Sequence, residues 1–104
     1  MRSVLVYNND VLAGELTEVG ATEYVFTYDD AYLKDDGQPS ISITLSKKQK
    51  RHESEKLFAF FTNMLPEGVN RQVLCKMNKI DDNDYFGMLE AVRGWDFIGS
   101  VCIK

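Results

Sequence analysis

Few side chains in this sequence are placed to do chemistry. The carboxylates between Asp81 and Asp84 could hold magnesium or calcium, but this run lacks the spaced ligands and the closing glutamate of a calcium-binding loop. Acidic side chains that precede a helix also cap it, and we interpret the run in that way. His52 is the only histidine, and Cys75 and Cys102 lie far apart. We therefore predict no metal site, and cysteines that stay reduced.

The parts needed for phosphoryl transfer or nucleophilic catalysis are also not recognisable. A phosphate-binding loop needs clustered glycines that open a helix, and none of the seven glycines has that setting. A protein kinase needs an ATP-clamping lysine, a catalytic aspartate and metal-binding residues, and no such set is apparent. The only histidine lies in a basic run, so no nucleophile with a paired base can be identified. We predict a chain that is not an enzyme and binds no cofactor.

The charge of the chain is unevenly distributed around a net value of −4. Residues 1–45 contain eight acidic and two basic residues, and the remainder contains eight acidic and ten basic residues. The acidic total argues against attraction to nucleic-acid phosphates. The exception is the basic run Lys47–His52, which we interpret as a hydrated connector. The alternative is a DNA-binding patch, whose phosphate contacts would be Lys47, Lys48, Lys50 and Arg51.

Composition points to one compact domain over residues 1–104, since 44% of the residues are hydrophobic and can bury a core. No apolar run is long enough to cross a bilayer. The segment Met1–Tyr7 is too short and too quickly polar for a secretory signal. We expect a cytoplasmic protein with no membrane partner.

The first half of the chain is predicted to form strands. Alternating apolar residues and the turn residues around Asn9 favour a hairpin, and Gly14 inside its second strand suggests a bulge. The segment Asp29–Gln38 is predicted to be a polar connection from which Tyr32 and Leu33 contact the sheet. The expected strands, including one near the end of the chain, are Ser3–Tyr7, Val11–Leu16, Tyr24–Tyr28, Ser40–Leu45 and Phe97–Ile103.

The densest apolar run, Leu57–Gly68, is called the anchor run below. It predicts a helix, the anchor helix, that starts near Ser54 and ends before Pro66. Its buried face would consist of residues spaced three and four apart, namely Leu57, Phe60, Phe61, Met64 and Leu65. A second helix is indicated by Val73, Leu74, Met77 and Ile80. A third helix, ended by Gly94, would have four inward-facing residues, Tyr85, Phe86, Leu89 and Val92. The predicted fold is α+β, a curled antiparallel sheet or partial barrel of about five strands packed by about three helices.

The anchor run also carries a family resemblance. Residues Phe60–Gly68, FFTNMLPEG, resemble the Phe-Phe-x-Asn-Leu-Leu-Pro-Glu-Gly signature in the amino-terminal subdomain of HipA-type kinases, the toxins of bacterial toxin–antitoxin pairs. Two flanking segments match in order. Pro39–Leu45 is similar to the family's Pro-Ile-Ser-x-Ser-Leu strand, and the segment Asp84–Gly99 is similar to its Asp-x-Phe-x-Leu-Leu and Gly-x-Asp-x-x-Gly pattern. The resemblance runs over nearly the whole chain.

The resemblance includes the subdomain and not the ATP-binding kinase core. It implies a separately encoded small subunit of a split system, an antitoxin that binds and neutralises a HipA-like Ser/Thr kinase core. A helix-turn-helix DNA-binding protein is the other component that the resemblance implies. An accessory subunit that stabilises or activates the kinase is the alternative, and a DNA-binding regulator that uses the basic run Lys47–Arg51 is a further one.

We predict that partner binding centres on the turn after the anchor helix and on a second turn near the end of the chain. An aromatic and an arginine at such turns are typical anchors of interfaces, although Trp95 is equally explained as a partly buried core residue. The predicted contact residues are Met64, Leu65, Glu67, Val69, Asn70, Arg71, Trp95 and Asp96. The family often has a bulky aromatic after Glu-Gly, where this sequence has Val69.

Overall fold

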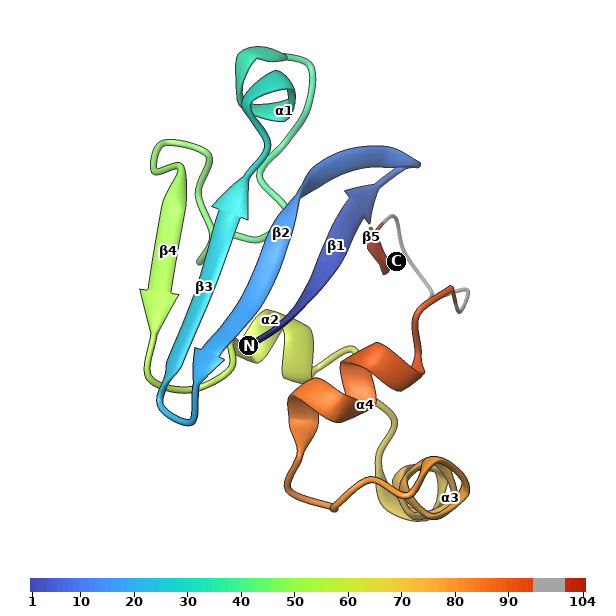
Figure 1. The fold of residues 1–104 in the computed structure, drawn as a ribbon. Coiled ribbons are helices and arrows are strands. Elements are labelled where there is room, and N and C mark those ends of the chain that lie inside the picture. Colours follow the sequence, from blue (N-terminus) through green and yellow to red (C-terminus); the bar gives the residue numbers. More distant parts are fainter. Residues whose placement is uncertain (95–100) are drawn as a thin grey trace.

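A sheet of five antiparallel strands forms the frame of the domain (Figure 1). The computed structural model describes residues 1–94 and 101–104. The strands are β1 (Arg2–Asn8), β2 (Val11–Gly20), β3 (Glu23–Tyr28), β4 (Arg51–Ser54) and β5 (Val101–Ile103). Their spatial order is β4-β3-β2-β1-β5, so β4 and β5 form the edges of an open sheet. The predicted α+β fold with five antiparallel strands is confirmed, and the sheet is not closed into a barrel.

The β1–β2 hairpin forms as predicted, and its details follow from two short sequence signals. Asn9 and Asp10 both have positive φ, 51° and 64°, as a two-residue turn between twisted strands requires. The bulge lies where Val6 pairs with Gly14 and the register then shifts. A Cβ atom on Gly14 would lie 2.3 Å from the carbonyl oxygen of Thr27, so only glycine fits this position.

One face of the sheet carries the core. Val4, Val6, Leu16 and Phe26 are buried, whereas Leu5 between the first two is exposed. This alternation is the pattern of a sheet with one covered and one solvated face. The chain after β4, with its helices and the residues next to them, supplies the side chains that cover this face. Those in the core cluster include Phe61, Leu65, Phe86, Met88, Leu89 and Val92.

The described residues form four helices, which are α1 (Asp30–Lys34), α2 (Ala59–Thr62), α3 (Gly68–Asn78) and α4 (Tyr85–Ala91). The sequence reasoning missed α1, which lies inside the predicted polar connection and is capped by Asp29. The prediction that Tyr32 and Leu33 contact the sheet is confirmed, because Tyr32 is buried and Leu33 packs against the core. Within the described ranges, every helix is too short to cross a bilayer.

The predicted strand Ser40–Leu45 is wrong. Ile41 and Leu45 are buried, but Ile43 between them is fully exposed, and the segment is a tight turn with a single bridge between Ser42 and Leu45. The hydroxyl of Tyr28 explains this shape, because it accepts from Ile41 N at 3.1 Å and donates to the Leu45 carbonyl. The alternation of apolar and polar residues in this segment therefore belongs to a turn whose two ends are held by Tyr28, and not to a strand. The edge strand is β4 instead.

The predicted anchor helix is shorter than expected. Its expected start, Ser54, belongs to β4 and pairs with Tyr24 of β3, so the helix is confined to α2. Phe61 and Leu65 are buried as predicted. The other residues of the predicted face are Leu57, Phe60 and Met64, which are partly buried against the same core.

The apolar residues that indicated α3 do not share one buried face, and the inward position predicted for Tyr85 of α4 is wrong. Val73 and Met77 of α3 are exposed, and Leu74 and Cys75 are the buried residues of that helix. Tyr85 at the start of α4 is also exposed, whereas Phe86, Leu89 and Val92 are buried as predicted. The predicted last strand is described only over Val101–Ile103, where it pairs with β1, and its residues 97–100 lie outside the described part of the chain.

Candidate partner-binding surface

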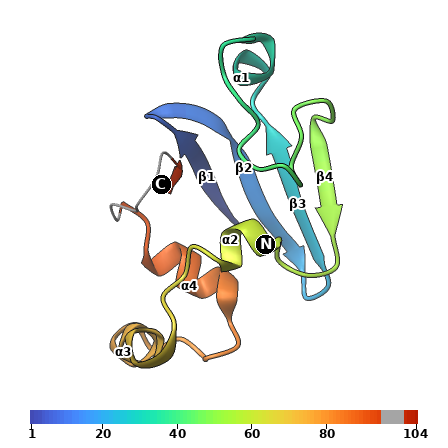
Figure 2. The same ribbon diagram turned by 180° about the vertical axis from the view of Figure 1, so that it is seen from behind.

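Helix α3 lies at the end of the molecule farthest from α1, and α4 lies between it and the sheet in both views (Figures 1 and 2). Leu74 and Cys75 attach it to the rest of the domain, and burial raises the pKa of the Cys75 thiol. The helix ends at Lys79, which adopts the left-handed conformation, and Ile80 N then donates to the Cys75 carbonyl at 2.8 Å. Most of the remaining surface of α3 faces solvent.

An apolar stripe runs along this solvent-facing side. It consists of Val69, Val73 and Met77, which are 72%, 49% and 78% exposed. Residues four apart lie one above the other on a helix, so the three side chains form one continuous ridge. A single exposed apolar residue needs no explanation, but a contiguous row of them is typical of a contact surface.

A groove of about 370 Å³ lies beside the apolar stripe. Its lining residues are Pro66, Asn70, Val73, Leu74, Met77 and Asn78. The Asn78 amide is fixed by donating to the Leu74 carbonyl at 2.9 Å. A ridge next to an apolar groove is the surface form into which the side chains of a second helix pack.

A second, more polar groove of about 430 Å³ is lined by Glu67 and Arg71 and reaches Tyr24. Arg71 is held in place there, because its Nε donates to the Pro66 carbonyl at 3.1 Å and its guanidinium lies 5.4 Å from the ring centre of Tyr85. The contact leaves Tyr85 partly exposed. It fixes the start of α3 against α4.

The structure places the predicted contact residues in different settings. Glu67 precedes α3, and Val69 and Asn70 lie in its first turn, so these residues begin a helix and do not form a projecting loop. All three residues are exposed. Leu65 is only 4% exposed, because the chain after α2 stays against the core, with Leu65 N donating to Thr62 O.

Of the remaining predicted contact residues, Met64 is half-buried against the core, and Arg71 is half-buried on Tyr85. Trp95 and Asp96 lie outside the described residues. Whether a partner touches any of these positions stays a prediction.

Sequence reasoning missed Val73 and Met77 as surface residues because their spacing is the same for a buried face and an exposed one. One signal was available. Leu74 and Cys75 lie on a different side of α3 from the apolar stripe, so the helix has two apolar sides, and only one of them can pack on the core.

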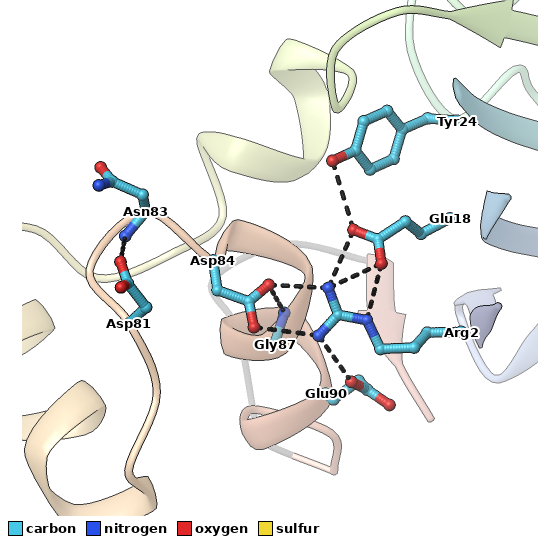
Figure 3. Close-up of polar contacts among 8 residues, drawn as sticks. All are labelled: Arg2, Glu18, Tyr24, Asp81, Asn83, Asp84, Gly87 and Glu90. Carbon is cyan, nitrogen blue, oxygen red and sulfur yellow. Dashed lines mark hydrogen bonds and ion pairs between the residues drawn. The ribbon is translucent and has the colours of Figure 1, made fainter. Parts of the chain in front are cut away.

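A cluster of charges around Arg2 lies between α4 and the sheet (Figure 3). Arg2 Nε donates to Glu18 Oε1 at 2.8 Å, and its Nη2 donates to Asp84 Oδ1 at 2.8 Å. Glu90 Oε1 lies 3.6 Å from Arg2 Nη1, and the Arg2 guanidinium packs on the Phe86 ring. Asp84 also caps α4 by accepting from Gly87 N at 3.0 Å. The cluster therefore joins α4 to the first two strands.

The cluster also changes the acid–base behaviour of its members. Hydrogen bonding to Arg2 lowers the pKa of the Asp84 carboxyl, and the same contacts raise the pKa of Arg2. Burial, followed by the negative charge of Glu18, raises the pKa of Tyr24, whose hydroxyl donates to Glu18 Oε2. Within the run Asp81–Asp84, Asp84 is the residue that acts as the predicted helix cap.

Replacing Asp84 by asparagine is expected to lower the free energy of unfolding at pH 7 by about 1 kcal/mol, because the Arg2 ion pair is lost while a capping oxygen remains. Since the pKa of Asp84 is lower in the folded than in the unfolded protein, its contribution is complete above about pH 4 and is lost as the pH falls further. Urea unfolding between pH 7 and pH 2.5 should show a shallower acid decline for Asp84→Asn than for the parent.

The matched control for this prediction is Asp36→Asn, which removes an exposed carboxylate from the connection after α1. As the pH falls, the free energy of unfolding of this control should decrease as steeply as that of the parent. If the Asp84→Asn and Asp36→Asn curves run parallel to each other at all pH values, the Arg2 cluster does not contribute to acid stability in the way described.

The basic run Lys47–His52 is mostly engaged within the domain. Lys47 Nζ donates to the carbonyls of Asp35 and Gln38, at 2.8 and 2.7 Å. Lys50 pairs with Asp30, and Arg51 pairs with Glu53. These contacts fix the run against α1 and β4 and reduce the positive charge available for phosphate contacts.

Comparison with known proteins identifies a family and a similar solved structure. The family model "HipA N-terminal domain" matches residues 4–104. Among solved structures, the N-terminal domain of HipA toxin superposes with a TM-score of 0.69 at 22% sequence identity, and the match covers 100% of this chain and 93% of that one. At this identity the likeness shows the shared fold. A search of curated proteins found no match.

Proposed function

Because this chain belongs to the HipA N-terminal domain family, we propose that it is a non-catalytic subunit of a bacterial HipA-like toxin–antitoxin system. In this proposal it binds a separately encoded Ser/Thr kinase core and neutralises it. A helix-turn-helix DNA-binding protein would be the third component of the complex. The observation that carries the proposal is the apolar stripe on α3, which a domain with no partner would leave in water.

The solved relative supports the choice of partner. It is named as the N-terminal domain of a toxin, and it has the fold of the present chain. In a longer protein, an N-terminal domain meets the following domain within one chain. When the two are separate chains, the same contact forms between molecules and needs an apolar centre with a polar rim. The apolar stripe, with asparagines and lysines beside it, has this composition.

The two alternatives differ in their support. A subunit that stabilises or activates the kinase would use the same contact, so only the sign of its effect separates it from an inhibitor. A DNA-binding regulator that uses the basic run has less support, because Lys47, Lys50 and Arg51 already bond within the domain.

The test is coexpression of this chain with a HipA-like kinase core encoded beside it. We expect the kinase alone to stop growth, and coexpression to restore colony formation, because a bound inhibitor removes free kinase. Affinity purification of the kinase should recover the chain in a stoichiometric complex. A catalytically inactive kinase serves as the control, since it should bind the chain equally well without affecting growth.

Two outcomes would contradict this proposal. Growth arrest that deepens on coexpression, with a complex present, would assign the activating role. Growth arrest that is unchanged, with no complex recovered, would remove this kinase as the partner.

A further inference from the structure

We infer that the apolar stripe and its groove receive an amphipathic helix of the kinase core, one that carries apolar residues three or four apart and acidic residues along one flank. The inference rests on the proposed function only in taking the kinase core as the source of this helix. It adds the form, the chemistry and the orientation of the contact.

The shape of the surface favours a helix over a strand or a loop. Val69, Val73 and Met77 form a ridge, and the groove bounded by Pro66 and Leu74 runs beside it. A ridge of residues four apart beside a groove matches the side-chain rows of a second helix. From residue 69 to residue 77 the ridge is roughly 12 Å long, about two turns of the partner. Met77 is a flexible side chain that adapts to the shape of what it contacts.

The charges beside the ridge set the chemistry of the partner. Residues 68–80 contain three basic residues and no acidic one, and the nearest acidic residues in the sequence are Glu67 before the helix and Asp81 and Asp82 after it. At 100° per residue, Lys76 follows one flank of the ridge, and the groove residues Asn70 and Asn78 follow the other. Lys79 is the left-handed residue that directly follows the helix. Both lysines are exposed, and neither forms an ion pair within the described ranges. Acidic residues on the partner would face these lysines.

A second copy of this chain fits the surface less well. Two α3 helices packed side by side in the same direction would bring Lys76 and Lys79 of one copy near the same cations of the other, with no acidic residue of either helix between them. Like charges at an interface oppose association. An acidic helix avoids this cost and gains from the same lysines.

Calorimetry with purified, catalytically inactive kinase core tests the apolar part. Val73→Asp should weaken binding at least about 30-fold, because it places an unpaired charge in the centre of the contact. Val19→Asp is the matched control, since Val19 is a half-exposed valine on β2, and it should bind as the parent does. The thermal unfolding midpoint of Val73→Asp must equal that of the parent, and Val73→Ala, with a smaller loss of affinity, serves if it does not.

Charge reversal tests the acidic flank. The double variant with Lys76→Glu and Lys79→Glu should lose about tenfold in affinity at low salt and show a weaker salt dependence, and Lys48→Glu should show neither change. A crosslinker attached through Met77→Cys should reach kinase residues that recur at helical spacing next to Asp or Glu.

Each outcome of these tests is decisive. Parent-like affinity of a folded Val73→Asp variant, with growth rescue retained, would overturn this inference and leave the proposed function intact. Crosslinks to a strand or loop would overturn the helix. A dimer of the chain alone that Val73→Asp dissociates would assign the surface to a second copy. No binding by the parent chain would overturn both proposals.

Discussion

Replacing Phe61 by alanine is expected to lower the free energy of unfolding by about 3–5 kcal/mol, as for other fully buried phenylalanines. Phe61 is fully buried, and its ring lies 5.8 Å from that of Phe26 and 5.3 Å from that of Phe60. It is the buried residue of α2, a helix of four residues that is too short to be stable by itself. Domains of this size are stable by roughly 5–15 kcal/mol, so the variant should be partly unfolded at 37 °C.

Urea unfolding followed by circular dichroism measures this loss. Phe60→Ala is the matched control, because the neighbouring ring is only partly buried against the core. It should cost about 1–2 kcal/mol, in proportion to the smaller apolar area removed. Equal losses for the two variants would show that α2 does not hold the core through Phe61.

The second large effect is expected for Tyr28→Phe, which removes one oxygen atom and almost no volume. The Tyr28 hydroxyl accepts from Ile41 N and donates to the Leu45 carbonyl, and the side chain is buried. Without it, two buried backbone groups lose their partner, at about 1–3 kcal/mol each before relaxation. We expect a total loss of about 2–4 kcal/mol in the free energy of unfolding.

Hydrogen exchange locates this loss as well as measuring it. The Ile41 amide should exchange faster in Tyr28→Phe, in step with the lower stability. Tyr24→Phe is the control, since Tyr24 is half-buried and its hydroxyl, among the described residues, bonds only to the carboxylate of Glu18 at 3.3 Å. It should lose less than about 1 kcal/mol. Equal stability of the two variants would mean that other groups hold the turn at residues 41–45.

Local signals predicted those parts of the fold that local physics determines. The pair Asn9–Asp10 and the glycine at position 14 mark the hairpin and its bulge, because each residue type is suited to its own backbone geometry. The turn at residues 41–45 and strand β4 could not be predicted in this way. Their conformations depend on Tyr28 and β3, which lie more than ten residues earlier in the chain.

The candidate surface was predicted only in part for a similar reason. Val69, Asn70 and Glu67 were identified by their place after the anchor run, and they are exposed. The orientation of α3, which exposes Val73 and Met77, depends on which apolar side packs on the core, and spacing alone does not determine that. The Arg2 cluster has no sequence signature, since Glu18 and Asp84 are remote from Arg2 in the chain.

The pairing of β5 with β1 has a consequence for the kinetics of folding. Strands β1, β2 and β3 are joined by short turns, whereas Val6 pairs with Ile103 across most of the chain. Closing so long a loop costs more entropy than closing a hairpin, so we expect the hairpins to assemble first and β5 to dock late. During synthesis on the ribosome, the outer edge of β1 stays unpaired until Lys104 can bond to Leu5. An open strand edge of this kind can pair with another nascent chain, so residues 101–104 should influence the yield of folded protein more than their small buried area suggests.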